Sequence, residues 1–141
     1  MFERYDKDFD FFKDQINPSE DTIFKLKKFV RMLLAHQKNM NLIGKSTMPV
    51  IWKRHILDCA QIEKILPKEN KNYITVDVGT GAGFPGIVLA VMGRKDLLLC
   101  EKSTKKNIFL NAVVKECNLK IKMHNDRIEN LKAKNIRTII A

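Results

Sequence analysis

The hydrophobic positions of the chain follow two different patterns. Up to the polar segment 68–72 (KENKN), apolar residues recur at intervals of three and four, which is typical of one face of an amphipathic helix. Beyond this segment, short apolar runs alternate with longer amphipathic ones, as in a sheet whose strands are joined by helices. We therefore predict a helical extension over residues 1–70 and an α/β region over residues 71–141.

The extension is predicted to hold three helices. Four aromatic residues near its start, spaced three or four apart, predict a short helix with an aromatic stripe that packs on a larger body. They are Phe2, Tyr5, Phe9 and Phe12. A second helix is expected to start at an Asn17 cap and to run to about Lys38. A third is expected to start at Ser46 or Thr47 and to end at Pro67.

The α/β region reads as alternating strands and helices. The predicted strands are 74–78, 97–101, 121–125 and 138–141, and the predicted helices are 84–92, 103–118 and 127–131. Strands that alternate with helices in this way predict a parallel sheet with helices on both faces.

The distribution of charge along the chain indicates a class of binding partner. The net charge is +10, and the first twenty residues carry six acids and three bases. From Lys25 to Arg54 the chain has eight lysines or arginines and no acid. Such a stripe suits a polyanion, because neutralised phosphates release counterions, although a lysine-rich sequence can also simply solvate its helix surfaces.

Other features of the sequence bear on cellular location and on disulfide or metal sites. No apolar run approaches the roughly 18 residues needed to cross a bilayer, and the first residues lack the features of a signal peptide, so we expect a cytoplasmic protein that avoids membranes. Cys59, Cys100 and Cys117 are far apart and form no CxxC motif. We expect them to be buried thiols, with neither a disulfide framework nor a metal site.

The segment DVGTGAGFPG, residues 77–86, holds four of the six glycines. Gly81, Gly83 and Gly86 match the G-x-G-x-x-G pattern of nicotinamide dinucleotide sites. The register disagrees with this match, because a strand that ends at Val78 makes Gly79 the first glycine of the turn. A dinucleotide remains the first alternative.

The carboxylates favour a cationic ligand instead. Asp77, at the end of the first strand, would repel a pyrophosphate, whereas S-adenosylmethionine carries a sulfonium and an ammonium group. Glu101 supplies a second acid for ribose hydroxyls, and Phe84 can pack on the ligand. After the third strand, Asp126 either contacts the ligand or caps a helix, and both interpretations stay open.

Several stretches carry a more specific resemblance. DVGTGAGFPG is preceded by NLIGKS and WKRHILDCA and is followed by EKSTKKNIFLNAVV and NDRIENL. From about Thr22 onward the chain resembles the bacterial 16S rRNA guanine-N7 methyltransferases, also called glucose-inhibited division protein B. The most specific elements are the FPG end of the loop and the RHILD segment.

The resemblance implies a Rossmann-like class I methyltransferase that uses S-adenosylmethionine and no metal, and that acts on 16S rRNA or its small-subunit precursor as a monomer. By motif, the implied cofactor contacts are Gly79, Gly81, Phe84, Glu101, Ile128 and Glu129. Arg54, His55 and Asp58 match the family's RH-x-x-D segment and are candidates for the substrate side. Guanine N7 has a lone pair and no proton to lose, so the transfer needs positioning and charge stabilisation but no general base. A helix-packing role for His55 and Asp58 stays open.

The family's sheet has the strand order 3-2-1-4-5-7-6, of which this chain would hold 3-2-1-4. The fourth strand would then form an open apolar edge, so we expect a truncated chain that is poorly stable and inactive alone. Two other functions stay open at this point. One is a fragment of a nicotinamide-binding oxidoreductase, and the other is a non-enzymatic module that binds RNA through the basic stripe.

Overall fold

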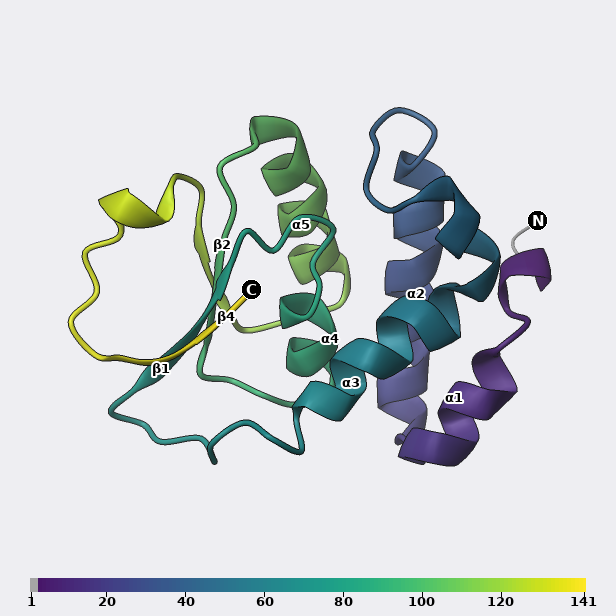
Figure 1. Cartoon of the computed structure of the whole chain (residues 1–141), viewed down its shortest axis with the longest axis horizontal. Helices are drawn as coiled ribbons and strands as arrows, with labels where there is room; N and C mark the ends of the chain where they lie inside the picture. Colours follow the sequence, from purple (N-terminus) through teal and green to yellow (C-terminus); the bar gives the residue numbers. More distant parts are fainter. Residues whose placement is uncertain (1–2) are drawn as a thin grey trace.

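The computed structural model describes residues 3–141 (Figure 1). The extension consists of η1 Glu3–Tyr5, α1 Phe9–Ile16, α2 Glu20–His36, η2 Lys45–Val50, η3 Trp52–Leu57 and α3 Asp58–Ile62. The α/β region consists of β1 Ile74–Val78, α4 Gly86–Val91, β2 Leu97–Cys100, α5 Thr104–Glu116, β3 Lys122–His124, η4 Ile128–Asn130 and β4 Ile136–Ile140. None of the helices in the described part of the chain is both long and apolar enough to traverse a bilayer.

The sheet confirms the predicted order. All pairings are parallel, and the strands follow one another as β3-β2-β1-β4. Val76 in the middle of β1 pairs with Leu98 on one side and Ile139 on the other. β4 begins at Ile136, two residues earlier than the apolar run alone predicts.

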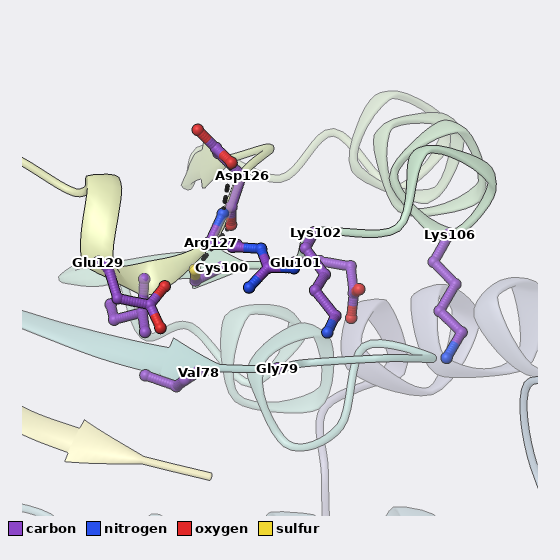
Figure 2. A pocket seen from close by; sticks show the side chains of 10 residues that line it. Val78, Gly79, Cys100, Glu101, Lys102, Lys106, Asp126, Arg127 and Glu129 are labelled. Carbon is purple, nitrogen blue, oxygen red and sulfur yellow. Dashed lines mark hydrogen bonds between the residues drawn. The ribbon is translucent and has the colours of Figure 1, made fainter.

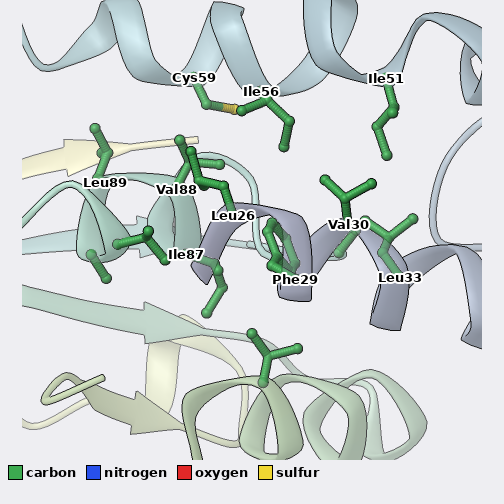
Figure 3. Close-up of a cluster of buried hydrophobic side chains, with 14 of the residues drawn as sticks. Leu26, Phe29, Val30, Leu33, Ile51, Ile56, Cys59, Ile87, Val88 and Leu89 are labelled. Carbon is green, nitrogen blue, oxygen red and sulfur yellow. The ribbon is translucent and has the colours of Figure 1, made fainter. Parts of the chain in front are cut away.

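The two faces of the sheet are covered differently. Leu97 and Leu99 belong to the main hydrophobic cluster, together with buried residues of α2, α4 and α5 (Figure 3). Val76, Leu98 and Cys100 point to the other face, where a second cluster forms. On this second face the predicted helix 127–131 is the single 3₁₀ turn η4, and Ile128 and Leu131 pack on the cluster there. A single helical turn covers less of a sheet face than a longer helix would.

The aromatic stripe packs where the pattern predicted it. α1 begins at Phe9, later than expected, while Tyr5 lies in η1 and Phe2 lies outside the described residues. The ring centroids of Phe9 and Phe12 lie 4.8 and 5.4 Å from that of Trp52 in η3. Edge and tilted contacts at these distances stabilise the docking of α1 on η3.

The cap of α2 corrects a prediction. Ser19, not Asn17, caps this helix, and its hydroxyl accepts a hydrogen bond from Thr22 N at 3.2 Å. Asn17 instead ends α1 with a φ of 49°, a left-handed conformation that asparagine tolerates better than most residues. α2 ends at His36, two residues before the predicted Lys38.

The predicted third helix is not one regular α-helix. It runs from the 3₁₀ segment η2 through the π-helical η3 into the short α3, which ends at Ile62 well before Pro67. Neither Ser46 nor Thr47 starts a helix, since both lie inside η2 and the chain enters from Gly44 in an extended conformation. The Thr47 hydroxyl turns back and donates to Gly44 O at 2.7 Å, which favours the tight turn.

A buried arginine joins the extension to the sheet. Arg94, only 4% exposed, lies just before β2 and donates to both carboxylate oxygens of Asp96 at 2.7 and 3.0 Å. It also donates to Glu63 Oε1 at 3.2 Å and to Pro67 O at 2.7 Å, both in the chain that follows α3. Asp96 in turn accepts from the Thr75 hydroxyl of β1 at 2.8 Å. We refer to this network as the Arg94 clamp.

The three cysteines are buried free thiols, as predicted. Burial raises the pKa of Cys59 to about 12, and the nearby charges of Asp77 and Asp58 raise it further in the same direction. A thiol that stays protonated and buried is unreactive.

Candidate functional site

The glycine turn, residues 79–86, leaves β1 in a conformation that needs glycine. Gly79 has a φ of +66° and Gly83 a φ of +102°, values that residues with a Cβ rarely adopt. Gly86 faces a second constraint, because a Cβ there would lie 2.7 Å from Asp77 Oδ2 and from side-chain carbons of Leu99. The glycines therefore allow the turn both to bend sharply and to pack directly on the sheet.

Asp77 holds this turn from beneath. Its side chain is fully buried, and Oδ2 accepts hydrogen bonds from the Thr80 hydroxyl at 2.6 Å and from Gly86 N at 2.9 Å. Oδ1 has no hydrogen-bond partner among the described residues. Burial raises the pKa of Asp77 to about 6, the hydrogen bonds from Thr80 and Gly86 oppose this rise, and the charge of Glu101 adds to it. Asp77 thus shapes the turn and does not line the pocket, contrary to the expectation that it faces a cationic ligand directly.

Glu101 holds the turn from the side. It follows β2, is 7% exposed, and accepts hydrogen bonds from Gly81 N at 2.9 Å through Oε1 and from Ser103 N at 2.8 Å through Oε2. Two backbone donors fix the plane of the carboxylate. Each oxygen keeps a further lone pair for a ligand.

The backbone N–H groups of the turn are nearly all used internally. Those of Gly79 and Thr80 donate to Cys100 O, and those of Gly83 and Phe84 donate to Thr80 O. The N–H groups of Gly81 and Gly86 donate to the two carboxylates described above. A dinucleotide turn instead directs free N–H groups at the pyrophosphate. This turn therefore fits a dinucleotide poorly.

A pocket of about 370 Å³ opens at the carboxyl ends of β1 and β2 (Figure 2). Its lining residues are Val78, Gly79, Cys100, Glu101, Lys102, Lys106, Asp126, Arg127, Ile128 and Glu129. Four of the six predicted cofactor residues are among them, from three separate loops. Their meeting at one edge follows from the parallel order of the strands.

The other two predicted cofactor residues lie elsewhere. Gly81 shapes the turn through its bond to Glu101 but does not line the pocket. The Phe84 ring faces the extension, where it stacks on His55 at 5.1 Å with an interplanar angle of 10° and meets Phe29 edge-on at 5.6 Å. These apolar and aromatic neighbours explain why Phe84 turns away from the pocket.

The substrate-side candidates lie on η3 and the start of α3. Arg54 and Asp58 are exposed, and His55 is half-buried with Nε2 at 2.8 Å from Thr47 Oγ1. Burial lowers the pKa of His55 and the charge of Arg54 lowers it further, while the charge of Asp58 opposes both. The exposure of Asp58 argues against the alternative of a polar pair buried against the sheet.

The comparisons with known proteins agree with this geometry. The family model described as "GidB: rRNA small subunit methyltransferase G" matches residues 22–141. The chain belongs to this family.

Relatives in this family share more than a third of the aligned residues. The chain is similar to "Ribosomal RNA small subunit methyltransferase G" of Orientia tsutsugamushi (strain Ikeda), with 38% identity over 126 residues, 89% of this chain and 63% of that protein. For the protein of that name from Rhodospirillum rubrum, identity is 36% over 120 residues, 85% of this chain and 59% of that protein. For the protein of that name from Rickettsia typhi, identity is 41% over 114 residues, which are 81% of this chain and 58% of that protein. The chain thus spans about 63% or less of the length of these relatives.

In this member of the family, sequence reasoning missed part of the pocket wall. Lys102, two residues before α5, and Lys106, in its first turn, line the pocket beside Glu101. Their position within five residues after the acid at the end of β2 was the available signal. Asp126, for which two roles were open, lines the pocket and also supports η4, since it accepts from Arg127 N at 2.7 Å and from Asn130 Nδ2 at 2.8 Å. Those hydrogen bonds lower its pKa.

Proposed function

We propose that this chain carries the cofactor-binding part of a methyltransferase that transfers a methyl group from S-adenosylmethionine to N7 of a guanine in small-subunit rRNA. The observation that carries this proposal is the glycine turn, in which Gly81 N donates to Glu101 and Gly86 N donates to Asp77, while Glu101 also lines the pocket. Membership of the methyltransferase family supports the same assignment.

The pocket residues suit the parts of this cofactor. Glu101 is held by two backbone donors in an orientation from which it can accept hydrogen bonds from ribose hydroxyls. Ile128 gives an apolar wall for the adenine, because it lines the pocket while packing on the cluster around Val76. Gly79 lets the ligand approach the backbone, since a side chain would otherwise project there. Glu129 and Asp126 add two further carboxylates to the lining.

The reaction requires little proton chemistry from the protein. When bound, S-adenosylmethionine supplies an electrophilic methyl group on a sulfonium. Guanine N7 would bond to the methyl carbon with its lone pair while the methyl–sulfur bond breaks and leaves a neutral thioether, so no group has to remove a proton. A neutral His55, favoured by its lowered pKa, is compatible with an orienting role, and the exposed Arg54 is placed to contact a phosphate or a base edge.

Calorimetry with S-adenosylmethionine tests the proposal on matched glycine variants. Gly79→Ala and Gly93→Ala both place a Cβ on a residue with positive φ and open space around it, but only Gly79 lines the pocket. Each should lower the free energy of unfolding by roughly 1–2 kcal/mol. Only Gly79→Ala should abolish the binding heat.

The outcomes separate the remaining functions. Equal heats for the two variants would contradict a cofactor turn. Binding of NADH in place of S-adenosylmethionine would favour the oxidoreductase alternative. Salt-dependent RNA binding that ignores S-adenosylmethionine would favour a non-enzymatic RNA-binding module.

A further inference from the structure

A second hollow lies at the opposite end of the sheet from the pocket. Its volume is about 550 Å³, and it collects residues from the chain before β1, the turn before β2 and the turn before β3. The lining residues are Glu69, Asn70, Lys71, Tyr73, Ile74, Lys95, Asp96, Leu97, Lys120 and Lys122. We call it the lysine hollow. None of its members was singled out as a functional residue from the sequence.

The positive charges of the lysine hollow are available to a partner. Its four lysines are all exposed, and none has a salt bridge or a side-chain hydrogen bond among the described residues. The two acids of the hollow are already engaged. Glu69 Oε1 accepts from Lys95 N at 3.2 Å, and Asp96 is held by Arg94 and Thr75 in the Arg94 clamp. The hollow therefore presents net positive charge.

An aromatic ring adds a second chemical feature. Tyr73 is 46% exposed, and the guanidinium carbon of Arg137 on β4 lies 5.9 Å from its ring centroid. Ile74, half-buried at the start of β1, adds apolar surface to the same hollow as the lysines. A simple anion would need only the cations. An exposed aromatic ring between several cations is the arrangement by which proteins bind a nucleic acid strand, with bases on the ring and phosphates on the cations.

We propose that the lysine hollow binds a single-stranded segment of the RNA substrate, at a second contact remote from the methyl-transfer pocket. The inference rests on the proposed function, since it takes RNA as the substrate class. β1 spans five residues between the two ends of the sheet, which is roughly 16 Å. An RNA that reaches both sites has to extend at least about this far along the protein, so its contacts include nucleotides beyond the target guanine.

The test compares two variants with the same change of charge. Lys120→Gln/Lys122→Gln removes two charges from the lysine hollow, whereas Lys7→Gln/Lys13→Gln removes two exposed charges from the region around α1. Fluorescence anisotropy with a short labelled single-stranded RNA is measured between about 50 and 200 mM salt. The hollow variant should bind roughly tenfold more weakly, and its slope of log affinity against log salt should be about 1.4 less steep. The control pair should show a smaller change in both.

A third variant tests the aromatic contact separately. Tyr73→Leu should weaken RNA binding at least about fivefold and leave the salt slope unchanged, because it removes stacking and no charge. Equal losses for the two lysine pairs, or no loss with Tyr73→Leu, would overturn the proposal.

Calorimetry on the same samples distinguishes a failure of this proposal from a failure of the proposed function. The hollow variants should retain the binding heat of S-adenosylmethionine, which also shows that they are folded. If the unchanged chain gave no such heat but still bound RNA through the lysine hollow, the proposed function would fail and the RNA contact would stand.

Discussion

The two ends of the parallel sheet use buried charge in opposite ways. At the carboxyl end, the carboxylates of Asp77 and Glu101 accept hydrogen bonds from backbone N–H groups and fix the shape of the glycine turn. At the amino end, the guanidinium of Arg94 donates hydrogen bonds to two carboxylates and a carbonyl from separate segments of the chain. The lysines near it are exposed and take no part in this network. Buried charge shapes the wall of a pocket at one end, whereas at the other it joins two parts of the fold.

The largest effect is expected at the amino end. Arg94→Met should lower the free energy of unfolding by about 3–5 kcal/mol, because Asp96 would lose its buried cationic partner. Arg31→Met, an exposed arginine on α2, is the matched control. Urea unfolding followed by circular dichroism measures both. Similar losses in the two variants would show that the Arg94 clamp does not join the extension to the sheet.

At the carboxyl end, close packing of the turn is expected to matter next. Gly86→Ala should cost about 1–3 kcal/mol, since the new Cβ would overlap Asp77 Oδ2 and the Leu99 side chain. Gly44→Ala is the control, because its nearest neighbour would be Thr47 Oγ1 at 3.9 Å. The same unfolding experiment checks this, and unchanged stability of Gly86→Ala would mean that the turn can move away from β1.

The pH dependence of stability should reveal Asp77. Its pKa of about 6 in the folded protein lies above the value near 3.9 of an unfolded aspartate, so the folded state binds this proton more tightly. The contribution of this group to stability is full below about pH 4 and is lost as the pH rises to about 6, by on the order of 2 kcal/mol. Asp77→Asn should make the free energy of unfolding depend less on pH over this range. The exposed control Asp14→Asn should leave the pH dependence unchanged. Persistence of the slope in Asp77→Asn would assign it to another group.

The smallest effect should come from neutralising Glu101. Glu101→Gln keeps the size of the side chain, but its amide nitrogen cannot accept a hydrogen bond, so one of the two backbone bonds is lost. The other is weakened, since bonds to a charged acceptor are roughly twice as strong as neutral ones. We expect about tenfold weaker binding of S-adenosylmethionine by calorimetry, and no change for Glu116→Gln at the far end of α5. Unaltered affinity of Glu101→Gln would remove this carboxylate from the proposed site.

Sequence patterns predicted the parts of the fold that depend on local periodicity. The β1 run ends at Val78 as predicted, and this register placed Gly79 first in the turn. The alternation of strands and helices brought Glu101 and Ile128 to the same edge as Gly79, where the structure has them. These features follow from the spacing of apolar residues and from the geometry of parallel sheets.

Other features depend on contacts between residues far apart in the chain. Nothing near Phe84 in the sequence indicates that it stacks on His55, 29 positions earlier, and so leaves the pocket. The burial of Asp77 depends on the packing of α4 at Gly86, and the lysine hollow brings together three turns. The π-helical η3 has no recognisable signal in its apolar spacing, which also fits an ordinary helix.

The stack of His55 on Phe84 joins η3 to the glycine turn. Thr47 fixes one edge of the imidazole, and Phe84 belongs to the same short turn as Gly79. An RNA contact that moves η3 must therefore move the turn or break the stack. For a chain that binds S-adenosylmethionine and RNA as proposed, the two affinities are then coupled, and each ligand changes the binding of the other by the same factor.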